Sequence, residues 1–377
     1  MATDRYAAPP PMVVEARDER LRDATGRVYV DLCMGYGSVW LGHGRPAVTR
    51  AVAAQLDMYA APGYLPTAVQ EAARAALAAF LPQTHFVGGF YSTGMEAVET
   101  ALRAARVHTG REDIVGFSGS EHGRSFLTAA IGGAPVAGSP GFVHHLQPFT
   151  PDGLKVLERD LTRLAGRVAL AAIVVEPVQM TAGGWEITPA SCEALFRIAR
   201  ERGICVIFDE TLTGLHRCGP RFYADVAGVD PDILILGKGL GNGFPCAAVA
   251  LRKGFAWDRE QVRPGSTFWN HPLACAAARA TLDELSRLGA ADRVAHIAAV
   301  INSVLGDLEL RGRGAMWCLG CQAPDRLAAF AARLLEAGVV VSYYDRYVRL
   351  LPPLTIAIDA LQGACQTIRR VHADTFG

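Results

Sequence analysis

The sequence lacks an excess of charge of either sign and lacks any long apolar run. Its 377 residues contain 37 Lys and Arg and 37 Asp and Glu, so the formal net charge is 0. A balanced chain has no long-range field that would attract nucleic acid or an anionic membrane. The longest apolar stretch, near residues 168–175, has the length of a strand and falls short of the ~18 residues of a membrane span. We therefore expect neither a nucleic-acid nor a membrane partner.

The first twenty residues lack the apolar core of a signal peptide, and the nine cysteines are scattered and odd in number. This usage is typical of reduced thiols, so we expect a cytoplasmic protein. One Cys-x-x-Cys motif occurs, at Cys318 and Cys321. Because no second pair accompanies it, a buried strand is the favoured interpretation over a redox motif, and we expect no metal site.

What the sequence does contain is a regular alternation of apolar strands and helices. Half of the residues are apolar, which is enough for a large core and favours one large and one small domain. Continuous apolar strands separated by helices predict a parallel sheet covered on both faces. The expected strands lie near residues 85–91, 113–117, 169–175, 204–208 and 233–236. After residue 272 a mixture of helices and short strands predicts the small domain, including a helix over 292–310 and a strand over 315–319.

One lysine stands in a glycine-rich turn between two apolar stretches. The run 233–236 is followed by Gly237 and Lys238, and residues 246–251 are again apolar. A phosphate-binding loop would open a helix and place its lysine after the glycines, whereas this lysine precedes most of them. Two interpretations remain open, which are a plain structural turn and an amine that forms a Schiff base with a carbonyl cofactor.

Polar side chains follow the predicted strands at their carboxyl ends. These residues are Glu121, Glu176, Asp209 and Lys238. Open α/β sheets bind their ligands at this edge. Polar residues from four separate segments at one edge of the sheet are a stronger signal than any single motif, so we expect them to form one site there.

Two further stretches each have competing interpretations. Residues 92–95 join the strand at 85–91 to a helix, and such a turn either offers N–H groups to a phosphate or is an ordinary helix cap. The glycine-punctuated loop 35–44 carries Tyr36 and Trp40. These rings either line the rim of a pocket or pack as buried side chains.

The chain carries an ordered series of short motifs. They are Asp23-Ala-Thr-Gly26, Gly42-His-Gly-Arg-Pro46, Ser92-Thr-Gly-Met-Glu-Ala97, His122-Gly-Arg-Ser125, Glu176-Pro-Val-Gln179, Phe208-Asp-Glu210, Gly237-Lys-Gly239, Gly265-Ser-Thr-Phe268 and Arg349-Leu-Leu-Pro-Pro-Leu354. Taken in order, these motifs resemble those of the class III, or omega, aminotransferases, which are pyridoxal-phosphate enzymes of fold type I. The resemblance covers nearly the whole chain, and the ordered set is highly specific although each motif alone is weak.

The resemblance implies an α/β fold with a mainly parallel central sheet flanked by helices, plus a smaller α+β domain built from both termini. The expected divisions are an N-terminal segment at 1–45, a large cofactor-binding domain at 46–280 and a small domain at 281–377. The implied partners are a small-molecule amine donor, a carbonyl acceptor and a second copy of the chain in a homodimer.

The resemblance also implies a role for each site residue. Lys238 would hold pyridoxal phosphate covalently and then act as the base that moves the substrate proton, and Asp209 would pair with the pyridinium nitrogen. Arg349 matches a position that binds a substrate carboxylate in some members. Thr267 would reach the phosphate from the neighbouring subunit. The other implied cofactor contacts are Thr93, Gly94, Met95, Glu121, His122, Glu176 and Thr211, with Tyr36 and Trp40 as guesses for the substrate side.

The sequence also departs from the family pattern. Glu121 replaces an aromatic residue that stacks on the cofactor, Leu212 replaces a glutamine, and Met95 removes a hydroxyl from the phosphate turn. Thr181 stands near the place of a glutamate that guards the arginine. These changes leave Lys238 and Asp209 in place and favour a transaminase with a specialised substrate. A different pyridoxal-phosphate reaction, such as decarboxylation, racemisation or C–C bond formation, stays open because Glu121 could serve as an extra acid or base.

Overall fold

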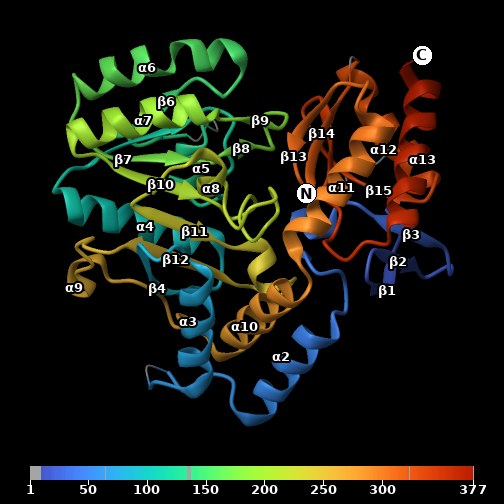
Figure 1. The fold of residues 1–377 in the computed structure, drawn as a ribbon, viewed down its shortest axis with the longest axis horizontal. Helices are drawn as coiled ribbons and strands as arrows, with labels where there is room; N and C mark the ends of the chain where they lie inside the picture. Colours follow the sequence, from blue (N-terminus) through green and yellow to red (C-terminus); the bar gives the residue numbers. More distant parts are fainter. Residues whose placement is uncertain (1–9, 64, 134–136, 322, 377) are drawn as a thin grey trace.

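The computed structural model describes residues 10–63, 65–133, 137–321 and 323–376. Its centre is a seven-stranded sheet with strand order β4-β12-β11-β10-β7-β5-β6 (Figure 1). In this sheet β12 runs antiparallel to both neighbours and the other strands share one direction, so the expected mainly parallel sheet is confirmed. The strands are β4 (His85–Tyr91), β5 (Asp113–Phe117), β6 (Val143–Leu146), β7 (Leu170–Val175), β10 (Cys205–Asp209), β11 (Ile233–Leu236) and β12 (Ala247–Arg252).

Both faces of the central sheet are buried, because successive side chains of its inner strands enter two different hydrophobic cores. In β10, Val206 and Phe208 pack in the core that includes α7 (Pro189–Arg202). Ile207 packs in the other core, which includes α4 (Gly94–Thr109). In Figure 1 α7 and α4 lie on opposite sides of the sheet. This alternation explains why the inner strands are apolar at nearly every position, with aspartates only at their ends, Asp113 and Asp209.

Capping residues set the ends of the helix that follows β4. Thr93 accepts a hydrogen bond from the backbone N–H of Glu96, and the Glu96 side chain accepts one from the backbone N–H of Thr93, which is a capping box. The helix ends at Gly110, whose φ of +67° is the left-handed conformation that glycine adopts most easily. The sequence therefore places the first turn of α4 directly at the carboxyl edge of the sheet.

Two four-stranded sheets lie beside the central one, and β8 and β9 form a further two-stranded sheet. One has the order β1-β2-β3-β15, and its parallel pair β3–β15 joins the two ends of the chain. The other is antiparallel with order β13-β14-β17-β16. The strands are β1 (Val13–Arg17), β2 (Arg20–Asp23), β3 (Val28–Asp31), β13 (Leu310–Arg313), β14 (Met316–Gly320), β15 (Val339–Val340), β16 (Ser342–Tyr344) and β17 (Tyr347–Leu350). This is the expected smaller α+β part with contributions from both termini.

The remaining elements connect and cover these sheets (Figure 1). They are α1 (Met34–Gly37), α2 (Pro46–Met58), α3 (Ala68–Phe80), α5 (Phe126–Ile131), α6 (Pro151–Ala165), β8 (Val178–Gln179), β9 (Trp185–Glu186), α8 (Tyr223–Ala227), η2 (Lys238–Gly241), α9 (Arg259–Val262), α10 (Pro272–Arg287), α11 (Ala290–Leu305), η3 (Pro324–Arg326), α12 (Leu327–Glu336) and α13 (Ile358–Phe376).

The helix expected over 292–310 is wrong at its C-terminal end. Helix α11 stops at Leu305, Gly306 caps it, and residues 310–313 form the strand β13. β13 pairs with β14, so a partner further along the chain overrides the local helical pattern. Cys318 lies in β14 and Cys321 follows that strand, and both thiols are buried.

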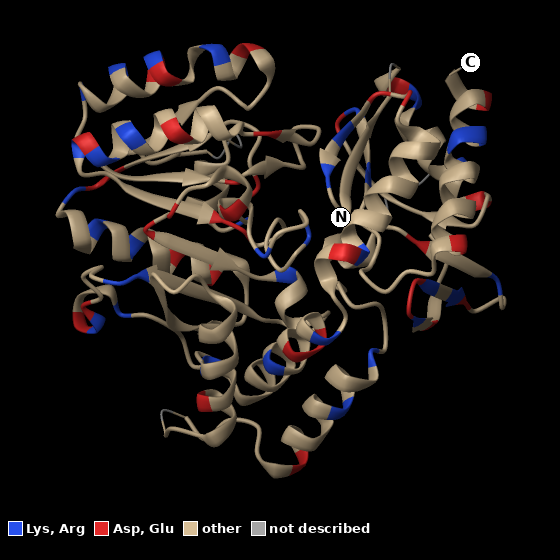
Figure 2. Cartoon of the chain, viewed as in Figure 1, with Lys and Arg blue, Asp and Glu red and all other residues tan. Residues whose placement is uncertain are grey.

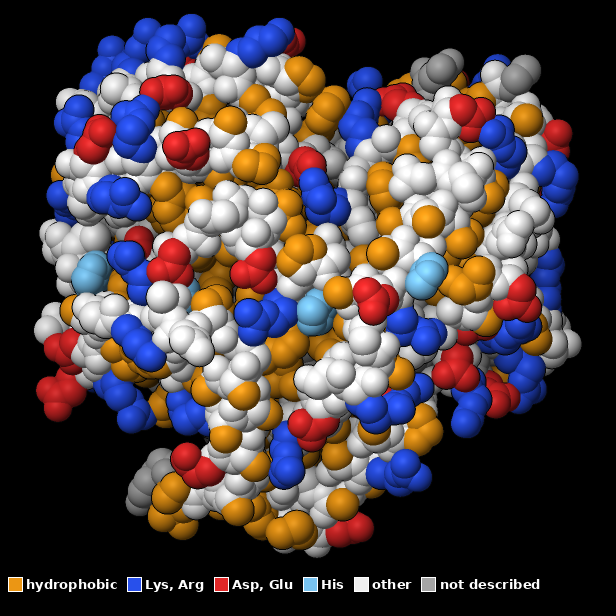
Figure 3. Space-filling view, viewed as in Figure 1, with side chains coloured by type: hydrophobic (Ala, Val, Ile, Leu, Met, Phe, Trp, Pro, Cys, Tyr) orange, Lys and Arg blue, Asp and Glu red, His pale blue; other side chains and the backbone are white. Residues whose placement is uncertain are grey.

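Charged side chains are interspersed over the molecule. Figure 2 shows Lys and Arg alternating with Asp and Glu along the outer helices, and Figure 3 shows the two signs mixed over the visible face. Within the described part of the chain no single helix is long and apolar enough to cross a membrane. The pair α10 and α11, bent by 74°, meets the length and composition criteria only when the two helices are taken together.

Candidate active site

The predicted polar residues come from the carboxyl ends of adjacent strands. Asp209 is the last residue of β10, Glu176 follows β7, and Lys238 follows β11 by two positions. β10 pairs with both β7 and β11, so these three segments reach the same edge of the sheet side by side. The loop that contains Glu121 and His122 follows β5, which pairs with β7.

A buried acid–imidazole pair forms the floor of this site. His122 Nδ1 lies 2.8 Å from Asp209 Oδ2, and the side chains are 0% and 4% exposed. The backbone N–H of Thr211 donates to Asp209 Oδ1 at 3.1 Å. Burial pushes the pKa of Asp209 up, but the hydrogen bond and charge of His122 outweigh burial and hold that pKa below its usual value. The site therefore keeps a buried carboxylate ionised.

Lys238 occupies a strained turn that its neighbours make possible. Its φ is +38°, a conformation that residues other than glycine rarely adopt. A Cβ at Gly237 would lie 2.9 Å from Thr211 Cγ2, and a Cβ at Gly239 would lie 3.0 Å from Trp40 Cβ. The flanking glycines are therefore needed for close approach on both sides of the lysine.

Burial also lowers the pKa of the Lys238 amine, and the negative charges of Glu176 and Asp209 oppose that shift. A lowered pKa raises the fraction of neutral amine, which is the form that attacks a carbonyl or accepts a proton. Burial raises the pKa of Glu176 to about 7. The Glu176 carboxylate accepts a hydrogen bond at 2.9 Å from the backbone N–H of Glu121, so it holds the loop after β5 in place.

The first turn of α4 presents two free amides to this site. The capping box of Thr93 and Glu96 uses the amides of Ser92, Thr93 and Glu96. No described residue accepts a hydrogen bond from the backbone N–H of Gly94 or Met95. The two interpretations of residues 92–95 are therefore compatible, since the turn is a capped helix that still offers two donors and a positive dipole end.

Two buried polar atoms in the same place have no partner among the described residues. They are His122 Nε2 and Thr211 Oγ1. Buried polar atoms in folded proteins are almost always hydrogen-bonded, so each such atom calls for an explanation. Thr211 lies between the glycines of two turns, because a Cβ at Gly94 would lie 3.6 Å from its Cγ2 and one at Gly237 would lie 2.9 Å away.

Arg349 comes to the site from the smaller part of the fold. Its Nε donates to Ser342 Oγ at 3.2 Å, and its guanidinium lies 5.6 Å from the ring of Tyr36. No described acidic side chain lies within 4.0 Å of it, so Arg349 forms no ion pair within the described part of the chain. After burial, which is the main cause, the positive charge of Arg349 also contributes to the lowered pKa of Lys238. Tyr36 itself is 59% exposed.

The structure corrects the expected position of Trp40, and Thr267 stays apart from the other residues. Trp40 is 1% exposed, and its Nε1 donates to the carbonyl of Leu215 at 2.8 Å, so its ring packs beneath the Lys238 turn and not at a pocket rim. Thr267 lies exposed in the loop between α9 and α10. Within a single chain, no described residue of the site bonds to Thr267.

Sequence reasoning missed the strain that accumulates around the lysine. Six residues other than glycine with positive φ lie in the segments that meet here, namely Met34, Tyr36, Leu215, His216, Lys238 and Asn242. Asn242 accepts from the N–H of Leu41 at 2.6 Å and donates to the carbonyl of Gly42, which ties the Lys238 turn to the N-terminal segment. Backbone strain of this kind concentrates at functional sites. The only sequence signal was an asparagine next to glycines, since asparagine adopts the left-handed conformation readily.

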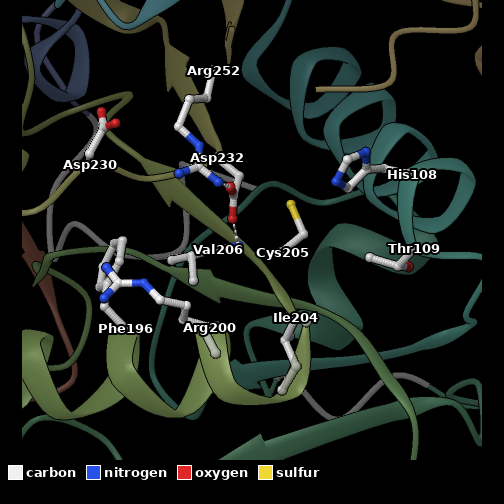
Figure 4. Close-up of a pocket in the computed structure, with 12 residues that line it drawn as sticks. His108, Thr109, Phe196, Arg200, Ile204, Cys205, Val206, Asp230, Asp232 and Arg252 are labelled. Atoms are coloured by element: carbon white, nitrogen blue, oxygen red, sulfur yellow. Dashed lines mark hydrogen bonds and ion pairs between the residues drawn. The ribbon is translucent and has the colours of Figure 1, made fainter. Parts of the chain in front are cut away.

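The described chain also has a hollow at the opposite edge of the sheet. Its volume is about 600 Å³, and Figure 4 shows Ile204 and Cys205, at the start of β10, and Asp232, before β11, among its lining residues. None of the predicted site residues lines it. Because open α/β sheets bind ligands at the carboxyl edge, the Lys238 site is the stronger candidate.

Comparison with known proteins decides the family. The model of the class-III aminotransferase family matches residues 2–371. This chain is a class III aminotransferase.

Curated relatives match over nearly their full length. The chain is 33% identical over 396 residues to the 2-aminoadipate transaminase of Pseudomonas putida, covering 95% of this chain and 94% of that protein. It is 33% identical over 387 residues to the acetylornithine aminotransferase of Bacillus subtilis, covering 96% and 94%. An (S)-enantioselective omega-transaminase from Thermomicrobium roseum superposes with a TM-score of 0.90 at 24% identity, covering 98% and 94%, and so shares the fold. The chain is thus a transaminase of fold type I.

Class III aminotransferases depend on pyridoxal phosphate, and the residues of this aminotransferase fit that group. The free amides of Gly94 and Met95 suit a phosphate, the ionised Asp209 suits a pyridinium N–H, and Lys238 supplies the amine. The unpartnered Thr211 Oγ1 offers a further polar contact. The Met95 side chain packs against the loop after β5, where its Sδ accepts a hydrogen bond from the N–H of Arg124 at 3.0 Å.

The departures from the family pattern are visible in this aminotransferase. Glu121 is exposed, and its Oε1 accepts from the N–H of Gly123 at 3.2 Å. Thr181 donates to the carbonyl of Gly119 at 2.6 Å and brings no charge to Arg349. Leu212 is buried, and a Cβ at Gly37 would lie 2.7 Å from its Cδ1, so it fills space between the N-terminal segment and β10.

Proposed function

We propose that this aminotransferase transfers an amino group between a donor and an acceptor that both carry a carboxylate, with pyridoxal phosphate as cofactor. The observation that carries the proposal is Arg349, a guanidinium that has no acidic partner among the described residues and whose charge acts on Lys238. Thr181 is neutral, so no acid of its own neutralises Arg349 when a substrate without a carboxylate arrives. The departures at Glu121, Leu212 and Thr181 support a specialised substrate, such as an intermediate of secondary metabolism.

In the proposed mechanism the chain positions and moves one proton. Bound pyridoxal phosphate supplies the electron sink for the electron pair left when the substrate loses its α-proton. Asp209, kept ionised by His122, would hold the ring nitrogen of the cofactor in its protonated form. The amides of Gly94 and Met95 would hold its phosphate. The Lys238 amine would accept the α-proton of the substrate and return it across the C–N bond, which its lowered pKa favours.

Substitution of Arg349 tests the substrate class. With an α-amino acid donor and 2-oxoglutarate as acceptor, Arg349→Met should lower kcat/KM by roughly 10- to 100-fold, since a charge-assisted hydrogen bond contributes about 1.5–3 kcal/mol. The control is Arg346→Met, because Arg346 lies in the same hairpin but is exposed and pairs only with Asp345 at 3.7 Å. Equal activity of wild type toward the amino acid and the matching amine without a carboxylate would contradict the proposal.

A second reaction class stays in view because of Glu121. Glu121 lies in the loop after β5, which Glu176 holds in place, and it directly precedes His122 in the chain. At this position its exposed carboxylate could act on a carbanion as an extra acid or base. Incubation with amino acids and no carbonyl acceptor separates the two cases. Sustained turnover beyond one equivalent of enzyme would favour decarboxylation, racemisation or C–C bond formation over transamination.

We also propose a cytoplasmic homodimer whose sites are shared, with the domain divisions 1–45, 46–280 and 281–377. Support comes from the exposed loop with Thr267 and from its neighbour Phe268, a large apolar side chain that is 54% exposed. Mixing a Lys238→Ala chain with a Thr267→Ala chain tests this directly. A hybrid dimer with shared sites contains one intact site, so the mixture should exceed the activity of either variant alone. No gain on exchange of subunits would count against sharing.

A further inference from the structure

Arg217 is a buried cation that none of the catalytic steps uses. It is 2% exposed, and no described acidic side chain lies within 4.0 Å of it. Burial lowers its pKa to about 9, so it stays protonated at neutral pH. A charge buried without a counter-ion is unfavourable unless hydrogen bonds compensate for the lost hydration. The presence of Arg217 at this buried position therefore calls for an explanation.

The guanidinium bonds to three separate segments. Its Nη2 donates to the carbonyl of Gly37 at 2.8 Å, and its Nη1 donates to the carbonyls of Pro352 at 2.9 Å and Ala315 at 3.4 Å. Gly37 directly follows Tyr36, and Pro352 lies three residues after Arg349. Arg217 lies in the loop after β10. Its hydrogen bonds thus connect this loop to the segment of Tyr36 and to the segment of Arg349.

The two segments that Arg217 joins are also bonded to each other. The backbone N–H of Leu351 donates to the carbonyl of Leu32, and that of Leu354 donates to the carbonyl of Trp40, both at 2.7 Å. Pro352, whose carbonyl binds Arg217, lies between Leu351 and Leu354 in the sequence. We therefore expect loss of the guanidinium to loosen the contact between the N-terminal segment and the segment after β17.

Trp40 extends this arrangement to the catalytic lysine. The Arg217 guanidinium lies 3.7 Å from the centre of the Trp40 ring, which is a close cation–π contact. The same indole packs against Gly239, where an added Cβ would lie 3.0 Å from Trp40 Cβ and 3.3 Å from Cγ. Gly239 is the residue after Lys238. Trp40 therefore contacts both the lysine turn and the guanidinium, and the guanidinium bonds to the segments that carry Tyr36 and Arg349.

The backbone directly before Arg217 is strained. The two preceding residues, Leu215 and His216, have φ of +58° and +67°. Trp40 Nε1 donates to the Leu215 carbonyl at 2.8 Å, and His216 Nδ1 lies 2.9 Å from the carbonyl of Gly219, so both strained residues are held in place. Consecutive left-handed residues that lack glycine persist only where the surroundings determine them.

We propose that Arg217 and Trp40 are positioning residues that fix the separation between the Lys238 amine and the Arg349 guanidinium. They thereby set where a substrate carboxylate lies relative to the reacting nitrogen, although neither touches the substrate. The inference rests on the proposed roles of Lys238 and Arg349. It differs from a purely structural role, which would lower stability without changing how substrates are distinguished.

Arg111 provides a matched control within the same chain. Its Nη1 donates to the carbonyls of Leu170, Arg202 and Gly203 at 3.1, 2.9 and 3.0 Å. It therefore also binds three carbonyls, but it does so at the edge of the central sheet opposite to Lys238. Arg111→Met should lower stability because it also removes hydrogen bonds from a guanidinium to backbone carbonyls. It should leave the distance between Lys238 and Arg349 unchanged.

The test compares Arg217→Met, Arg217→Lys and Arg111→Met in the holoenzyme by two readouts. The first is the KM for an α-amino acid donor against kcat, where Arg217→Met should raise KM by at least about 10-fold with a smaller change in kcat. The second is hydrogen exchange at the amides of Leu351 and Leu354, which should quicken by about 10-fold or more. Arg217→Lys should lie between Arg217→Met and wild type in both.

The outcomes separate this inference from the proposed function. If Arg217→Met matches Arg111→Met in both readouts, the positioning role is refuted. If wild type accepts no amino donor, the proposed function fails, and the hydrogen exchange alone then decides whether Arg217 couples the segments. Should Arg217→Met fail to fold, Arg217→Lys and Trp40→Phe replace it, since Trp40→Phe keeps a ring but removes the bond to Leu215. Unchanged KM and exchange in both would also overturn the inference.

Discussion

The hydrogen bond between His122 and Asp209 leads to a quantitative prediction about the pH dependence of the enzyme. The substitution His122→Phe keeps a ring in the buried space and removes the donor at 2.8 Å, while the Thr211 N–H at 3.1 Å remains. A buried charge-assisted hydrogen bond contributes about 1.5–3 kcal/mol, and 1.36 kcal/mol corresponds to one pKa unit. The pKa of Asp209 should therefore rise by about 1–2 units in the variant.

The sign of this effect follows from which form of Asp209 the pair stabilises. In wild type the pKa of Asp209 is depressed, so its contribution to stability is present above the pKa of the unfolded chain and is lost as the pH falls through the folded value. The pKa of His122 is raised, so its contribution is lost as the pH rises through the folded value. Removing His122 should move the loss of activity on the acid side toward neutral pH.

The assay is the pH profile of kcat/KM with a saturating acceptor, together with the unfolding midpoint in urea at each pH. The control is His144→Phe, because His144 also contacts an aspartate, Asp113 at 2.6 Å, but the pair is partly exposed and far along the sheet in β6 and β5. If the acid side of the pH profile does not shift in His122→Phe, or shifts equally in His144→Phe, the role assigned to the pair of His122 and Asp209 is refuted.

Three further predictions address the lysine turn and the loop after β5. Lys238→Ala should abolish turnover and the covalent mass increase on borohydride reduction with pyridoxal phosphate, and retention of either would remove Lys238 from its role. Gly237→Ala should destabilise the fold by about 1–3 kcal/mol in urea titrations, since its Cβ would lie 2.9 Å from Thr211 Cγ2, and a smaller cost should follow in Gly237→Ala/Thr211→Ser. Glu121→Tyr should slow cofactor loss on dilution, because a ring can then stack on the cofactor, and an unchanged rate would show that Glu121 lies away from it.

Much of the architecture could be predicted because its causes are local. The inner strands are apolar at nearly every position, since Val206 and Ile207 face two different cores, and such runs separated by helices are typical of a covered parallel sheet. The placement of Glu176, Asp209 and Lys238 at one edge followed from strand direction alone.

The details that could not be predicted depend on contacts between distant residues. Trp40 bonds to a carbonyl 175 positions away, and Arg217 bonds to Pro352 over 135 positions, so nothing beside either residue indicates a buried stack. The strand β13 was hidden for the same reason, because its pairing with β14 and not its composition determines it. The free amides of Gly94 and Met95 were visible as a motif, but their lack of a partner is a property of the folded chain.

The pairing of β3 with β15 has a consequence for synthesis on the ribosome. Every strand of the central sheet lies between His85 and Arg252, so that sheet can form while the last third of the chain is still unmade. β3 must wait for β15, and Arg349 arrives later still. A nascent chain therefore acquires the turn with Lys238 before Arg349, so with the roles proposed above catalytic competence is a late event in the life of each molecule.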